Sequence, residues 1–158
     1  MNARETPPQL AQFAECWREL YRRRADGYVA ACEALLLSLA DQPDTRCIGV
    51  LYSLLDDDAE YDELMYSLVH TAEGFSDPAY CGELLSTAPE LWLSSPRWSS
   101  IIFIRVLNSD ACRRELVRRL PESTPEIKAA VRGILAGITK EPGPLGGHAI
   151  EAASATHG

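Results

Sequence analysis

Apolar side chains along the chain recur at spacings of three and four residues, and the strict alternation of apolar and polar positions that marks β-strands is nearly absent. This is the period of amphipathic α-helices that pack one face into a core. Asp77-Pro78 and Ser95-Pro96 are typical helix starts, and residues 123–126 resemble a capping box. The sequence therefore predicts an all-α protein of about eight helices.

The expected helices group into pairs. The first runs from two prolines at 7–8 to a basic run at 22–24, which suits a helix C-terminus, and the second follows Asp26-Gly27. Four such hairpins begin near residues 7, 44, 78 and 109, at steps of 37, 34 and 31 residues. That spacing matches stacked helical-hairpin repeats, but no repeated residue signature accompanies it. Two architectures stay open: a HEAT-like stack of helical hairpins and a compact irregular helical bundle.

Length and composition indicate where the folded part ends. With 158 residues, of which 46% are hydrophobic, the chain suits one domain with a real core. After residue 139 the sequence KEPGPLGGHAIEAASATHG is rich in Gly, Pro, Ala and Ser. We expect a single helical domain over residues 1–139 and a flexible C-terminal tail over 140–158.

Two local features further divide the expected helices. The acidic run DDDAEYDE, residues 56–63, is expected at the start of the fourth helix, whose buried stripe includes Leu64, Met65 and Leu68. Pro89 predicts a short turn over 89–93 that ends the fifth helix.

The net charge of −8 is unevenly distributed. Residues 41–95 hold twelve acidic side chains and one basic side chain, whereas residues 97–140 hold nine basic and four acidic ones. The middle third repels nucleic acid and anionic membranes, and it attracts cations or a basic protein surface. Four arginines at 113, 114, 118 and 119 are interleaved with Glu115, which favours a solvated or salt-bridged helix face over a nucleic-acid site.

Six carboxylates in the eight residues 56–63 need an explanation. Acidic residues in a first helical turn account for two or three of them, and like charges this dense repel each other. A calcium loop starting at Asp56 would need a glycine sixth and a glutamate twelfth, but Tyr61 and Ser67 stand there. We therefore predict no metal and no cofactor, and a basic protein partner is the simplest remaining explanation.

Catalytic patterns are sparse in this sequence. His70 and Glu73 lie three apart on one helix face, but no serine or cysteine is marked as an activated nucleophile beside them. We expect that the protein is not an enzyme. The alternative to be tested is an all-helical enzyme that uses His70.

The five cysteines are widely spaced, without a CxxC pair, and each falls within a helical apolar pattern, which predicts buried, reduced thiols. The N-terminus lacks a signal-like apolar stretch, and no segment approaches a membrane span. These features predict a cytoplasmic protein that does not bind a membrane.

A basic partner would gain fast association from complementary charge and slow dissociation from aromatic anchors. Tyr61 lies inside the acidic run. For Trp92 and Trp98, the sequence leaves two roles open, packing in the core or contact with a partner. The charge pattern selects these candidate partner-binding residues: Asp56, Asp57, Asp58, Glu60, Tyr61, Asp62 and Glu63, with Glu73 and Asp77 as outer members.

Two stretches carry a family resemblance. LYSLLDDDAEYDELMYSLVHTAEGFSD, residues 51–77, combines the acidic run with His-Thr-x-Glu followed by Phe and Asp. SPRWSSIIFIRVLNSDACRREL, residues 95–116, has Ser-Pro-Arg-Trp opening an apolar helix that ends at Leu-Asn-Ser. Together they resemble the immunity protein 30 family of bacterial polymorphic toxin systems, whose members are small, largely helical and cytosolic.

The resemblance implies that the chain binds and neutralises the C-terminal domain of a toxin encoded beside it. The acidic field suggests a basic toxin domain, such as one acting on RNA or DNA, whose active site a carboxylate-rich surface would cover. The alternative is a HEAT-like helical adaptor that binds a basic protein partner without inhibiting it.

Overall fold

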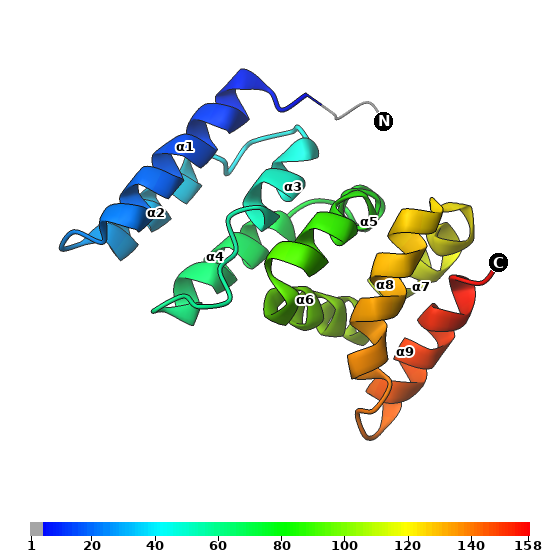
Figure 1. Ribbon diagram of the computed structural model, residues 1–158. Helices are drawn as coiled ribbons and strands as arrows, with labels where there is room; N and C mark the ends of the chain where they lie inside the picture. Colours follow the sequence, from blue (N-terminus) through cyan, green and yellow to red (C-terminus); the bar gives the residue numbers. More distant parts are fainter. Residues whose placement is uncertain (1–4) are drawn as a thin grey trace. The chain divides into compact units, whose positions relative to one another are not determined.

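The computed structural model describes residues 5–158, which form nine α-helices and one short 3₁₀-helix and contain no β-strand (Figure 1). The prediction of an all-α protein is confirmed. The helices group into two compact units, Met1–Gly74 and Phe75–Gly158. Residues 1–4, the start of the domain expected over 1–139, lie outside the described residues, and that domain boundary stays a prediction.

The first unit contains four helices: α1 (Pro8–Arg23), α2 (Tyr28–Leu37), α3 (Arg46–Tyr52) and α4 (Asp62–Ala72). The helices α1 and α2 lie side by side as a hairpin (Figure 1), α3 packs against α1 and α4, and α4 packs against α2. Their fully buried side chains form the core of this unit, among them Leu10, Trp17, Ile48, Leu51, Leu64, Met65 and Leu68.

The acidic run does not begin a helix where the sequence analysis expected one. The helix α4 starts at Asp62, so only Asp62 and Glu63 belong to its first turn. In the preceding loop, the amide of Asp58 donates to Asp56 Oδ1 at 2.9 Å, and the amide of Asp56 donates to Met65 Sδ at 3.3 Å. An aspartate that bonds the amide two residues on stabilises a turn, and this competes with helix formation.

The second unit contains α5 (Asp77–Ser94), α6 (Pro96–Asn108), α7 (Asp110–Arg119), the 3₁₀-helix η1 (Leu120–Glu122), α8 (Pro125–Ile138) and α9 (Pro144–Ala155). The helices α7 and α8 each pack against α5, α6 and α9, and α6 also packs directly against α9, which skips the intervening α7–α8 pair. In a stack of hairpins each pair would contact only its neighbours. Within this unit, the packing is therefore that of a compact bundle.

The turn expected at residues 89–93 is absent, because α5 continues through Pro89 to Ser94. A proline inside a helix removes one backbone hydrogen bond and typically costs about 3 kcal/mol. On either side of it, Leu84, Ala88 and Leu91 are buried on the same helix. The burial of this continuous apolar face offsets the local penalty, which the sequence pattern alone did not weigh.

Within the segment expected to be a flexible tail, the structure has a helix, α9 (Pro144–Ala155). Pro144 occupies its first turn, where a missing N–H does no harm. The small residues Gly146, Ala149 and Ala152 are buried, and α9 packs against α8 and α7. Small side chains let α9 approach its neighbours closely, although their abundance suggested flexibility in the sequence. A side chain at Gly146 would clash with the carbonyl oxygen of Glu141 in the turn before the helix.

Candidate partner-binding surface

The acidic loop, residues 56–61, is fixed at both ends by tyrosines of the α1–α2 hairpin. The hydroxyl of Tyr21, in the last turns of α1, donates to Asp56 Oδ2 at 2.7 Å. The hydroxyl of Tyr28, the first residue of α2, donates to Glu60 Oε2 at 3.2 Å. Both carboxylates therefore have partners inside the first unit.

Arg24 joins the same cluster from the turn between α1 and α2. Its guanidinium lies 5.4 Å from the centre of the Tyr21 ring, and its Nη1 is 3.8 Å from Glu60 Oε2. The Tyr28 ring stands edge-on to that of Tyr21, with centroids 6.3 Å apart, and lies 6.4 Å from the ring of Tyr61. We call Tyr21, Arg24 and Tyr28 the tyrosine clamp.

The clamp hydroxyls remain protonated donors. Burial and the hydrogen bond to Asp56 raise the pKa of Tyr21 far above its ordinary value. Desolvation and the neighbouring Glu60 raise the pKa of Tyr28. A phenol can donate to a carboxylate only while it keeps its proton, and both phenols keep theirs across the physiological pH range.

The remaining loop residues differ in exposure. Asp58, Glu60, Tyr61 and Glu63 are exposed, and Tyr61 keeps 46% of its surface accessible. Asp57 and Asp62 are partly buried. The structure thus brings together the predicted residues from Asp56 to Glu63 and gives them unequal access to a partner.

The two outer members of the predicted set belong to other elements. Glu73 follows α4 at its far end, about 16 Å along the helix axis from Asp62 at 1.5 Å per residue. Asp77 belongs to α5 in the second unit, where its Oδ1 accepts the thiol of Cys112 at 3.1 Å. Neither residue belongs to the acidic loop.

Charge divides between the two units as sharply as it does along the sequence. Residues 1–74 hold six basic and fourteen acidic side chains, so the first unit carries the entire net charge of −8. Residues 75–158 hold nine of each and are neutral. The negative long-range field of the chain therefore comes from the first unit.

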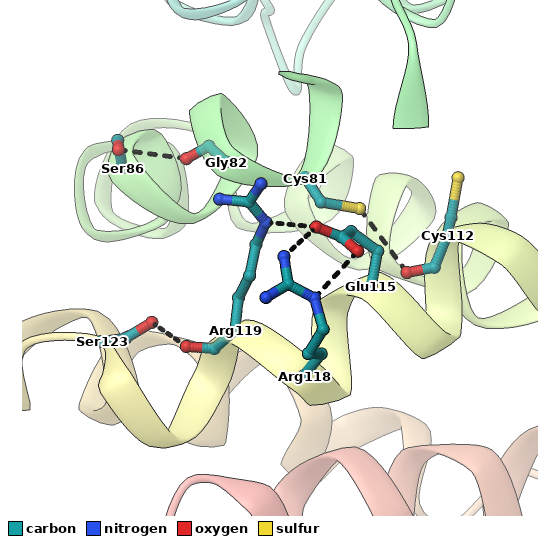
Figure 2. A network of polar contacts seen from close by, with 8 residues as sticks. All are labelled: Cys81, Gly82, Ser86, Cys112, Glu115, Arg118, Arg119 and Ser123. Atoms are coloured by element: carbon teal, nitrogen blue, oxygen red, sulfur yellow. Dashed lines mark hydrogen bonds and ion pairs between the residues drawn. The ribbon is translucent and has the colours of Figure 1, made fainter. Parts of the chain in front are cut away.

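The arginine-rich helix α7 is a salt-bridged surface, one of the two arrangements that the sequence indicated. Figure 2 shows Glu115 beside two arginines: Arg118 donates to it at 2.6 Å, and Arg119 Nε donates to its Oε1 at 2.6 Å. These hydrogen bonds lower the pKa of Glu115 to about 2. One helical turn earlier, Arg113 bonds Asp110 at 2.7 Å.

The two tryptophans whose role was open have different environments. Trp98 is fully buried in α6, with the guanidinium of Arg97 5.3 Å from its ring centre, so it is a core residue. Trp92 is 39% exposed, and its ring lies against Gly133 of α8, where an added Cβ would clash with it.

The cysteines are all free thiols, as predicted. Cys32, Cys47 and Cys81 are buried, and burial raises the pKa of each, in the case of Cys81 to about 12. Cys16 is exposed, contrary to the prediction, because α1 buries the face carrying Phe13 and Trp17.

Among residues 5–158, no group of three or more His, Cys, Asp or Glu side chains is arranged to hold a metal ion. His70 is exposed, with its ring 6.1 Å from that of Tyr66. In the same described part of the chain, no helix is long and apolar enough to cross a membrane.

Sequence reasoning located the carboxylates but missed the clamp that holds them. The sequence places Arg24 in a basic run at a helix C-terminus, and its local pattern indicates no polar contact for Tyr21 or Tyr28. The clamp residues lie more than thirty positions from their acidic partners, and no local pattern links them. The one sequence feature that could have indicated the clamp is the pair of tyrosines, Tyr21 and Tyr28, on either side of the Arg24–Gly27 turn.

The described residues are thus all-helical and carry an acidic loop bonded to tyrosines of the α1–α2 hairpin. The family model for immunity protein 30 matches residues 9–116, more than two thirds of the chain, and the chain belongs to this family. The matched residues include the whole acidic loop and its clamp and end within α7. No curated protein and no solved structure gives a match.

Proposed function

We propose that this protein binds a cognate bacterial toxin domain in the cytoplasm and neutralises it by covering its active site with the acidic loop and the first turn of α4. The family membership carries the immunity role. The concentration of the whole net charge in the first unit supports the place of contact. The role belongs to competition between bacteria through polymorphic toxin systems, and it needs neither a cofactor nor chemistry by this chain.

The exposed residues of the surface suggest how the complex forms. Asp58, Glu60 and Glu63 supply negative charge that accelerates the approach of a basic partner. Tyr61 offers an exposed amphipathic ring. Tyrosines that become buried when a complex forms often contribute much of its binding energy. The toxin domain that fits this surface has a basic cleft, as expected for an enzyme acting on RNA or DNA.

The first experiment co-expresses the chain with the toxin-like C-terminal region of the adjacent open reading frame and scores host survival and co-purification. We expect survival to depend on this chain and a stoichiometric complex to elute. Death of the host despite soluble expression, with no complex, would contradict the immunity role for that pair.

A second experiment locates the contact. The variant Asp58→Asn/Tyr61→Ala/Glu63→Gln should weaken toxin binding about 100-fold or more, since it removes two surface charges and an aromatic anchor. The matched control Glu90→Gln/Ile150→Ala/Glu151→Gln removes two exposed charges and one exposed apolar side chain from the second unit. If both variants bind the toxin like the wild type, immunity acts through another surface.

A further inference from the structure

We propose that Tyr21, Arg24 and Tyr28 are positioning residues, which hold the acidic loop in its binding conformation before the toxin arrives. This inference rests on the proposed toxin-binding role of the loop, and it assigns a part in that role to three residues outside the acidic run. None of the three needs to touch the toxin.

The need for such a clamp follows from the charge of the loop. Four carboxylates occupy the five positions 56–60, and a flexible segment with that density of like charges tends to spread. The clamp supplies donors to the first carboxylate of this group, Asp56, and to the last, Glu60. Asp57 and Asp58 lie between these two fixed points.

The two oxygens of Asp56 connect the clamp to the backbone of the loop. Oδ2 accepts the hydroxyl of Tyr21, while Oδ1 accepts the amide of Asp58. Fixing this carboxylate therefore also fixes the turn that presents Asp58. At the other end of the loop, Glu60 accepts the hydroxyl of Tyr28 and lies 3.8 Å from Arg24 Nη1. Glu60 immediately precedes the exposed Tyr61.

The backbone of Arg24 provides a separate indication. With φ at 48°, Arg24 adopts the left-handed conformation at the C-cap of α1, and it is the only non-glycine residue with positive φ in the described chain. Glycine fits this position best, because a Cβ makes the conformation unfavourable. The contacts of its guanidinium with the Tyr21 ring and Glu60 give a reason for an arginine here.

Holding the loop in advance strengthens binding in a calculable way. The apparent affinity of a site is proportional to the fraction of molecules that are in the competent conformation, so it falls when that fraction falls. A preformed loop also avoids the loss of conformational entropy on association. Weakening the clamp should therefore weaken toxin binding without changing any residue that contacts the toxin.

Hydrogen exchange of the free protein tests the clamp without the toxin. In Tyr21→Phe/Tyr28→Phe and in Arg24→Gly, amides 57–61 should exchange roughly three- to tenfold faster, while core amides of α4 stay unchanged. Arg24→Gly should keep or raise the melting temperature, since glycine relieves the left-handed backbone. Arg23→Ala is the matched control, because Arg23 bonds Glu19 within α1 at 2.7 Å.

The same variants are then titrated with the toxin domain. Affinity should fall in proportion to the fraction of molecules whose loop remains ordered, which the protection of amides 57–61 gives, and Arg23→Ala should bind like the wild type. The proposal is overturned if exchange at 57–61 stays at the wild-type rate in both clamp variants, or if these amides exchange almost as fast as in an unstructured chain while affinity does not change. If the wild-type chain binds no toxin, the proposed function fails, and the exchange rates still decide whether the clamp orders the loop.

Discussion

Glu115 makes the second unit sensitive to acid. Its carboxylate accepts hydrogen bonds from Arg118 and Arg119, which lower its pKa to about 2. In the unfolded chain the pKa is about 4.3. A depressed pKa stabilises the fold above the unfolded value and loses that contribution as the pH falls through the folded one. We therefore expect stability to decline between about pH 4.5 and 2 as Glu115 takes up a proton.

The variant Glu115→Gln isolates this effect. The variant should have a lower melting temperature than the wild type at pH 7. This difference should become smaller as the pH approaches 2, because protonated Glu115 and glutamine are both neutral. The exposed Glu90 of α5 gives the control Glu90→Gln. Thermal unfolding at a series of pH values measures both, and equal pH profiles for Glu115→Gln and the wild type would contradict the prediction.

At the scale of single residues, the sequence predicted chemistry better than contacts. It identified the carboxylates of the acidic run and the salt-bridged character of α7, where Glu115 lies three and four residues from its arginines. Such spacings are visible along a helix. The contact between Tyr21 and Asp56 spans 35 residues and depends on how α1 and the loop pack, which no local pattern encodes.

The contact between α5 and α8 depends on a missing side chain. The ring of Trp92 lies where a Cβ on Gly133 would stand, so Gly133→Ala should lower the free energy of unfolding by about 1–3 kcal/mol through overpacking. Gly137, one turn later on α8, has open space around it. Gly137→Ala should raise stability by about 0.5–1 kcal/mol, because alanine favours the helix. Chemical denaturation measures both changes, and equal effects would contradict the close packing of Trp92.

The docking of α9 gives a prediction for the segment that composition marked as flexible. Ala149 is fully buried and Ile150 is 56% exposed on the same helix. Ala149→Asp should cost about 3 kcal/mol and make amides 148–155 exchange rapidly, because it buries an unpaired charge. Ile150→Asp should change stability by no more than about 0.5 kcal/mol. Rapid exchange of these amides in the wild-type chain would show that α9 is not docked.

At the scale of helices, the apolar period was a good guide wherever burial and local preference agree. The N-caps Ser109 and Thr124, for example, are residue types with a strong preference for this position, and their side chains accept the amides of Cys112 and Ile127. The period failed where packing or a side-chain turn overrides it. Burial of leucines lets α5 continue through Pro89. The hydrogen bond from the amide of Asp58 to Asp56 holds a turn before α4 begins. Small buried residues let α9 pack as a helix.

For the whole molecule, the location of charge matters more than its total. At physiological ionic strength the Debye length is about 8 Å, so a binding surface responds mainly to charges close to it. The first unit carries −8 and the second is neutral. Two variants with the same net charge can therefore separate a general effect of acidity from a local one.

Asp58→Asn/Glu63→Gln and Glu90→Gln/Glu151→Gln each leave the chain at −6, and all four side chains are exposed. The first pair should slow association with the toxin several-fold at low salt and flatten its dependence on ionic strength, because it removes charge from the surface that steers the encounter. The second pair should associate like the wild type. Stopped-flow measurements between about 0.01 and 0.3 M salt decide this within the range where screening changes most. Equal slowing by both pairs would mean that the total charge, and not the acidic loop, attracts the partner.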